Sequence, residues 1–256
     1  MDGKLTVLIP AKDEEQNIRA CLESARELAD ELLVADSGSS DATMDIAREF
    51  GARIIEREYI NSANMKNWAI PQAAHEWVMI LDADERITPE LANSIRAAVR
   101  EPNAEAFTMQ RRSFIFGQAI RFCGWQRDVL VRLFRRDTCK YDDRRVHAKV
   151  IVPSGKTRRL HGALLHYTYR DFGQFMAKLD RYTTWSAQDL FERGRRATAT
   201  RLLGKPIARF LKQYVVQQGF RDGIAGLMLC GLSATSVFLR YAKLWVMWRK
   251  QPATAA

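Results

Sequence analysis

The stretch Trp77-Val-Met-Ile-Leu-Asp-Ala-Asp-Glu85 decides how the rest of the chain is interpreted. Its apolar beginning has the length and composition of a buried strand. Carboxylates follow at once, and ligands of open α/β sheets bind beyond the carboxyl ends of the strands. Asp82 and Asp84, separated only by Ala83, can hold Mg²⁺ or Mn²⁺, hard cations that also accept phosphate oxygens from a substrate. A strand that runs into an acidic turn is the alternative interpretation.

Two upstream segments end in the same way. Residues 5–9 form a strand candidate closed by Pro10, with a helix predicted over 16–28. Residues 32–35 form a second strand, and Asp36 follows where a carboxylate can bind a ribose hydroxyl or a base edge. Ser40 or Asp41 is expected to cap a helix over 42–50.

A third strand is predicted over 53–56 and a helix over 64–73, which places Lys66 just before the acidic strand. The order β-α-β-α-β predicts a mostly parallel, doubly wound sheet. The chain contains no G-x-G-x-x-G and no G-x-x-x-x-G-K-[ST] motif, so dinucleotide oxidoreductases and P-loop enzymes are poor candidates. A nucleotidyltransferase remains an alternative, although residues 10–14 do not form the glycine-rich phosphate loop that it would need.

Several motifs, in this order, resemble family 2 glycosyltransferases of the GT-A fold. They are Ile9-Pro10-Ala11-Lys12-Asp13-Glu14-Glu15, Val34-Ala35-Asp36-Ser37-Gly38-Ser39-Ser40-Asp41, Lys66-Asn67-Trp68-Ala69 and Leu81-Asp82-Ala83-Asp84-Glu85. Residues 124–134 (Gly-Trp-Gln-Arg-Asp followed by Arg-Leu-Phe), 146–147, 165–171, 219–223 and 241–245 resemble the lipopolysaccharide-core β-1,4-glucosyltransferase branch. The resemblance covers about residues 4–248. It implies an α/β fold with a Rossmann-like mixed sheet.

The resemblance also implies the roles of individual residues. Asp84 would bind the metal, and Asp82 would bind metal-bound water or ribose. The nucleoside pocket would be lined by Pro10, Lys12, Glu14 and Asp36, with Ala83 beside the donor.

Three further side chains are candidates for the diphosphate. Lys66 can reach it, and Arg132 can contact the diphosphate or an acceptor phosphate, although a solvated strand arginine is the alternative. His147 either joins the diphosphate–metal cluster or is a structural histidine.

One motif departs from the branch. Its relatives are expected to have Val-His-Glu-Lys-Val, whereas this chain has alanine at position 148. The missing carboxylate is a candidate general base, so Ala148 marks either a disabled enzyme or a base that lies elsewhere. Asp128 and Asp143 are the remaining acidic candidates, and Asp128 can also position the acceptor.

Charge separates the chain into two halves. Residues 1–110 contain 11 Lys+Arg and 21 Asp+Glu, whereas residues 111–256 contain 29 and 9. The first half suits a metal–nucleotide complex, and the second half suits a polyanion. A nucleic-acid partner is not expected, because Phe210 is the single aromatic residue in the basic run over 193–212 and no recognised module is apparent.

Residues 223–239 are uncharged, yet somewhat short for spanning a bilayer, which needs about 20 residues. A membrane-interfacial or re-entrant helix anchored by Trp245 and Trp248 and a buried core helix are both open interpretations. The four cysteines form no C-x-x-C pair and are expected to be buried thiols in a reducing compartment.

Together, these features predict a GT-A nucleotide-sugar-binding and catalytic domain over residues 1–160 and a helical, basic, membrane-associating region over 161–256. The expected reaction is inverting transfer of a hexose, glucose from UDP-glucose by resemblance, to a heptose hydroxyl of a lipopolysaccharide inner-core glycolipid. The expected location is the cytoplasmic face of the bacterial inner membrane, with no signal peptide. A catalytically disabled nucleotide-sugar-binding protein and a basic polyanion-binding protein are the alternatives.

Overall fold

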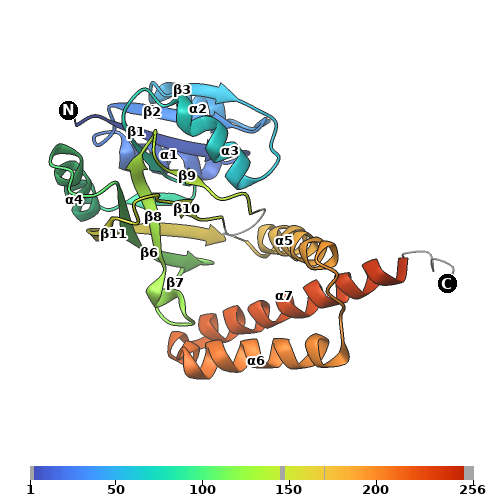
Figure 1. The fold of residues 1–256 in the computed structure, drawn as a ribbon. Coiled ribbons are helices and arrows are strands. Elements are labelled where there is room, and N and C mark those ends of the chain that lie inside the picture. The colour runs from blue at the N-terminus through green and yellow to red at the C-terminus, as the bar shows by residue number, and fades with distance from the viewer. Residues whose placement is uncertain (1–2, 145–147, 170, 251–256) are drawn as a thin grey trace. The chain divides into compact units, whose positions relative to one another are not determined.

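The computed structural model describes residues 3–144, 148–169 and 171–250 (Figure 1). The chain forms two compact units that are interleaved in sequence. Unit 1 consists of residues 1–112 and 128–167, and unit 2 consists of residues 113–127 and 168–256. The predicted domain division between residues 160 and 161 falls inside a strand that both units share, and it remains a prediction about function.

Unit 1 holds a sheet with helices on both of its faces. Its elements are β1 (Leu5–Ala11), α1 (Glu15–Ala25), β2 (Glu31–Asp36), α2 (Thr43–Glu49), β3 (Arg53–Glu56), α3 (Ser62–Ala69), a 3-10 turn (Ile70–Gln72), β4 (Trp77–Ile80), β5 (Glu85–Ile87), α4 (Pro89–Arg100), most of β6 (Ala106–Ile115), β8 (Val129–Arg135), β9 (Lys140–Tyr141), β10 (Val150–Ile151) and most of β11 (Thr157–Tyr169). The predicted β-α-β-α-β order is confirmed.

The side chains of β1 and β4 contact helices on both faces of the sheet in unit 1. Successive side chains of a strand point to opposite faces. Val7 and Met79 pack on one face with residues of α1, α2 and α4. Leu8 and Ile80 pack on the other face with residues of α3 and of the β9–β10 pair. Both faces of the central strands are therefore buried, which is why these segments are almost entirely apolar. The exception is Thr6, whose hydroxyl donates a hydrogen bond to Glu31 Oε2 at 2.6 Å.

The sheet is mixed rather than mostly parallel, which corrects one part of the sequence prediction. Within the described residues its order is β3-β2-β1-β4-β8-β6-β11-β5. The pairs β3–β2, β2–β1 and β1–β4 are parallel, whereas β8 pairs antiparallel with β4 and β6. The helical crossovers that impose parallel pairing connect only the first strands. The mixed sheet is the one that the family resemblance implied.

Pro10 does not close the first strand, because β1 continues to Ala11. The pairing of β1 with β4 ends at Leu8, whereas its pairing with β2 continues through Pro10. Proline cannot donate to a ladder, so it is tolerated where a neighbouring strand has already ended. The predicted cap is also different: Ala42 precedes α2 without a side-chain cap, and Asp41 accepts the N–H groups of Glu15 and Thr43.

Unit 2 is mainly helical. Its elements are β7 (Gln118–Ile120), a 3-10 turn (Trp125–Arg127), α5 (Phe172–Glu192), η3 (Thr200–Gly204), α6 (Lys205–Leu211), η4 (Lys212–Val216), η5 (Gly219–Asp222) and α7 (Gly223–Lys250). β7 pairs antiparallel with the last residues of β6. Helix α7 extends well beyond the predicted segment over 223–239, through both tryptophans. All four cysteines are buried free thiols, as the sequence predicted.

Gly162 permits the close approach of β11 to α4 within unit 1. Its φ of +86° is unfavourable for other residues, and a Cβ atom there would lie 2.4 Å from the backbone nitrogen of Leu91. Gly155 has a similar φ of +67°, but no atom lies within 4 Å of a Cβ placed there. Substitutions at Gly155 therefore test backbone strain alone, whereas substitutions at Gly162 test backbone strain together with steric overlap.

We expect Gly162→Ala to lower the free energy of unfolding by about 2 kcal/mol or more, because it combines left-handed strain with overpacking. Gly155→Ala should cost only the strain, about 1 kcal/mol. Urea unfolding of both variants measures the difference. Equal losses would show that the contact between Gly162 and Leu91 does not constrain the fold.

Candidate active site

The parallel strands β1, β2 and β4 place their carboxyl ends at one edge of the sheet, as the sequence predicted. Two loops there are tied together by side chain–backbone hydrogen bonds. Asp13 N–H donates to Ser39 Oγ at 3.0 Å, and Ser40 N–H donates to Asp13 Oδ1 at 2.8 Å. Glu14 N–H donates to Thr43 Oγ1 at 2.8 Å. These bonds link the loops after β1 and β2, which the sequence predicted to bind the nucleoside.

Asp36 is buried at the end of β2, where its carboxylate organises the following turn. It accepts hydrogen bonds from the N–H groups of Gly38 and Ser39, both at 3.0 Å, and from Ser39 Oγ at 2.6 Å. Gly38 takes a φ of +85° in this turn, which glycine adopts without penalty. The structure therefore gives Asp36 a role in shaping the turn after β2, and its contact with the nucleoside remains a prediction.

An ionic cluster forms around Asp82 at the end of β4. Lys66 Nζ, from α3, lies 2.8 Å from Asp82 Oδ1. Arg132 Nη2, from β8, bonds to Asp82 Oδ2 and also lies 2.8 Å from Glu85 Oε1. The side chains of Lys66 and Arg132 are 8% and 6% exposed, whereas that of Asp82 is 30% exposed. Solvent therefore reaches the cluster from the carboxylate side.

Each charged group of this cluster stabilises the ionised form of its partners. Burial alone would raise the pKa of Asp82, but Arg132 and Lys66 outweigh it and hold that pKa well below its ordinary value. Burial would likewise lower the pKa of Lys66, and the Asp82 carboxylate reverses this and raises it. All three groups are therefore ionised at neutral pH. Two buried cations converging on one strand end are suited to binding an anionic diphosphate.

A second chain of charges leads from this cluster to Asp128. The buried carboxylate of Glu85 accepts a hydrogen bond from Arg111 Nη1 at 3.4 Å. The same guanidinium also binds Asp128, because Arg111 Nε and Nη2 each lie 2.8 Å from Asp128 Oδ2. Asp128 is 23% exposed, so it can meet a substrate. Alternating charges thus run from Lys66 to Asp128, although these two lie far apart in the sequence.

Asp84 meets a histidine from a distant strand. His166 lies on β11, which pairs antiparallel with β5 in a register that sets His166 opposite Glu85. His166 Nε2 is 3.4 Å from Asp84 Oδ2, and Tyr167 N–H donates to Asp84 O at 2.9 Å. One carboxylate oxygen and one imidazole nitrogen are thereby presented side by side.

This pair suits a divalent metal that also binds substrate. Among the described residues no group of three or more His, Cys, Asp or Glu side chains could hold a metal ion. Mg²⁺ and its relatives are commonly held by one or two protein ligands together with substrate phosphates. Asp84 and His166 fit that mode, while both oxygens of Asp82 are taken up by cations in this structure.

Other predicted residues are not joined to these clusters by the contacts described above. Lys12 is exposed, Pro10 lies within β1, and Ala83 O accepts a hydrogen bond from Arg86. Asp143 is exposed, and Ala148 packs against the apolar cluster around Tyr141. His147 lies outside the described residues.

Sequence reasoning assigned no role to Glu85, Arg111 or His166. Glu85 was visible as the third carboxylate after β4, and His166 stood in a quoted motif. Arg111 had a weaker signal, because β6 also contains Arg112 and three uncharged polar residues. Each of the three gains its role from a partner that is distant in the sequence, which no local pattern reveals.

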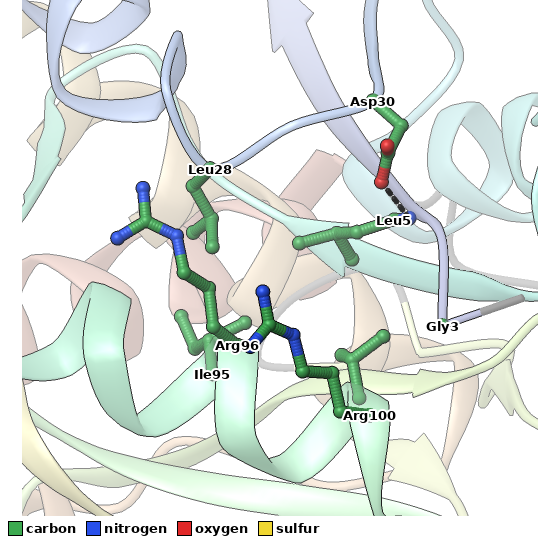
Figure 2. Close-up of a pocket in the computed structure, with 8 residues that line it drawn as sticks. Gly3, Leu5, Leu28, Asp30, Ile95, Arg96 and Arg100 are labelled. Carbon is green, nitrogen blue, oxygen red and sulfur yellow. Dashed lines mark hydrogen bonds between the residues drawn. The ribbon is translucent and has the colours of Figure 1, made fainter.

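A separate pocket of about 260 Å³ lies near the start of β1, the end opposite to the candidate site. Figure 2 shows Leu5, Leu28 and Ile95 beside Arg96 and Arg100. Leu5 N–H donates to Asp30 Oδ2 at 2.8 Å here. The pocket contains none of the predicted site residues.

Comparison with known proteins agrees with this geometry. Residues 6–161 match the family model described as glycosyl transferase family 2. A lipopolysaccharide core biosynthesis glycosyltransferase, LpsC of Rhizobium meliloti, is 28% identical over 94% of this chain and 92% of its own length. An uncharacterised glycosyltransferase of Rickettsia typhi is 27% identical over 94% of this chain and 86% of its own length.

A solved structure, TarS of S. aureus, is similar to 98% of this chain and 93% of that chain, with 15% identity and a TM-score of 0.49. The family model covers more than half of the chain, and its boundaries enclose the strand ends that carry the ionic cluster. The chain therefore belongs to glycosyl transferase family 2 and has its GT-A fold.

Proposed function

We propose that the protein is an inverting glycosyltransferase that transfers glucose from UDP-glucose to a hydroxyl of a membrane glycolipid, a heptose of the lipopolysaccharide inner core. The observation that carries the proposal is the convergence of Lys66 and Arg132 on Asp82 at the end of β4, two residues before the Asp84 that pairs with His166. The similarity to LpsC supports the acceptor class.

The donor would bind with its nucleoside over the loops after β1 and β2 and its diphosphate beside Lys66 and Arg132. Both cations are ionised and held at this strand end by Asp82, so their positive charge already lies where the diphosphate would bind. Asp84 and His166 would hold Mg²⁺ or Mn²⁺. When bound, the metal offsets diphosphate charge and stabilises the leaving group.

A carboxylate must then accept the proton of the acceptor hydroxyl as it attacks the anomeric carbon. Among the described residues Asp128 is the best placed, because Arg111 binds its Oδ2 twice and thereby orients the carboxylate. A single displacement inverts the anomeric carbon. Position 148 is the competing location for the base, and Ala148 supports a second candidate function, a disabled protein that binds nucleotide sugar without transferring it.

The proposed location is the cytoplasmic face of the inner membrane. A soluble nucleotide sugar and an amphiphilic acceptor meet most readily at a membrane surface. The strongly basic second half of the chain favours an anionic surface there.

A screen of nucleotide sugars by thermal unfolding, with and without Mg²⁺, tests the donor. We expect UDP-glucose to stabilise the protein in a metal-dependent manner. The gain should be roughly 2.7 kcal/mol at a free concentration one hundred times the dissociation constant. Stabilisation by a nucleotide with another base, and none by UDP-glucose, would reject this donor.

Asp84→Asn should weaken metal-dependent UDP binding by at least about tenfold, because a neutral amide is a poorer ligand for a hard cation. Calorimetry in Mg²⁺ and in chelator measures this effect. Asp45→Asn, which removes an equal charge from the exposed surface of α2, is the matched control. If Mg²⁺-dependent binding persists in Asp84→Asn, this carboxylate is not a metal ligand.

The base is tested by a pair of variants. If position 148 carries the base in relatives, Ala148→Glu should raise turnover by about 10²–10⁴-fold with donor affinity little changed. If Asp128 is the base, Asp128→Asn should abolish turnover while donor binding remains, and Ala148→Glu should add nothing. Single-turnover assays with UDP-glucose and a glycolipid acceptor separate these outcomes. A gain at position 148 combined with a silent Asp128→Asn would identify the chain as a disabled enzyme.

A further inference from the structure

The helical hairpin of unit 2, residues 200–250, exposes a row of large apolar side chains. Leu203, Ile207, Leu211 and Val215 lie four residues apart and are 51–60% exposed. In an α-helix a four-residue step overshoots a full turn by roughly 40°. The π-helical turns η3 and η4, on either side of α6, wind more loosely and offset that drift. We call this row the apolar stripe.

The opposite side of the same segment is packed, so the stripe is not a misplaced core face. Phe210 and Tyr214 pack with the apolar cluster that contains Leu229 of α7. Gln213 is buried, and its Nε2 donates to Cys123 O at 3.4 Å. The segment therefore has one side in contact with unit 2 and a second apolar side exposed.

The turn between the two helices is the most exposed apolar part of the hairpin. Val216, Phe220 and Ile224 are 74%, 52% and 79% exposed. The turn is nevertheless firmly held. Asp222 accepts the N–H groups of Arg121 at 3.1 Å and Phe122 at 2.8 Å. Exposure here belongs to a fixed structure rather than to a frayed end.

The segment that carries this apolar surface is strongly basic. After Glu192 the chain contains 12 Lys+Arg and a single carboxylate side chain, Asp222. That carboxylate is occupied by the two backbone N–H groups. Arg209 and Lys212 lie on α6 and η4 among the stripe residues, and both are exposed. An apolar face with a cationic rim complements an anionic bilayer, which offers hydrocarbon beneath negative headgroups.

We propose that the apolar stripe and the 216–224 turn insert into the headgroup–acyl boundary of an anionic membrane, with Arg209 and Lys212 on the lipid phosphates. This inference deepens the proposed function by specifying the surface that would meet the membrane carrying the acceptor. Apolar burial and electrostatic attraction together supply the two signals that stable peripheral attachment requires.

Helix α7 could instead cross the bilayer. In the part of the chain that the structure describes, the helical segment Gly219–Lys250 is long enough and apolar enough to do so, judged by length and composition alone. Its packing favours the interfacial mode. Lys243 Nζ bonds to Asp180 Oδ1 at 2.7 Å and to Thr183 Oγ1 at 2.9 Å, both on α5. A spanning α7 would expose these polar partners to hydrocarbon.

Vesicle flotation of the full chain tests the inference. Wild-type protein should float with vesicles of equal parts phosphatidylcholine and phosphatidylglycerol, and weakly with pure phosphatidylcholine. Replacing Ile207, Leu211 and Val216 together by glutamate should reduce partitioning by about tenfold or more. The control replaces Ile60 and Ile151 by glutamate, because these are equally apolar, exposed residues of unit 1. Arg209→Gln with Lys212→Gln should weaken binding to the anionic vesicles alone.

Far-ultraviolet circular dichroism and UDP binding check that each variant is folded. Wild-type-like flotation of the triple variant, or an equal loss in the control, would overturn the proposal. Resistance of bound wild-type protein to alkaline carbonate would reveal a spanning helix instead. If the wild type does not float and the triple variant turns a dimer into a monomer, the surface joins two copies of the chain. Donor binding is measured separately from vesicle binding. A failure of vesicle binding therefore leaves the proposed glycosyltransferase function intact, and a failure of donor binding leaves the membrane proposal intact.

Discussion

The carboxylate of Asp82 is the constraint on which the candidate site depends. It ends β4, receives Lys66 from α3 and receives Arg132 from β8, so three separately formed elements converge on one charge. Removing the carboxylate would leave the buried side chains of Lys66 and Arg132 without this partner, which is costly because desolvation penalises an unpaired buried charge. The antiparallel pairing of β8 with β4 is therefore more than a way to extend the sheet. It delivers the guanidinium that makes the cluster electrically balanced.

From this cluster a line of alternating charges reaches Asp128 through Glu85 and Arg111. Each member is oriented by its neighbour, which is the preorganisation that electrostatic catalysis requires. The proposed donor side and the proposed acceptor side of the reaction would thus be coupled through side chains of unit 1. A substrate diphosphate would compete with Asp82 for Lys66 and Arg132, so donor binding and the state of this network are linked by charge.

Unit 2 arranges its charged and apolar residues differently from unit 1. Many of its cations are exposed, Lys243 is paired with Asp180, and several of its large apolar side chains are exposed to solvent. Asp222 contributes by fixing the turn between α6 and α7, through backbone N–H groups rather than through another charge. The buried charges of the candidate site in unit 1 are paired within the fold, whereas Arg209 and Lys212 of unit 2 are exposed and are proposed to meet an anionic partner.

The sequence by itself determined the first strands, the helices between them and the carboxylates at their ends, because burial periodicity and strand-end chemistry are local properties. It also placed Lys66 on a helix just before the acidic strand, whereas the contact of Lys66 with Asp82 came from the structure. Tertiary structure decided the antiparallel half of the sheet, the pairing of Asp84 with His166 and the grip of Arg111 on Asp128. These partners are separated by many residues and meet only through strand order and register. Periodicity along one strand carries no information about which distant strand lies next to it, and so only the assembled sheet reveals them.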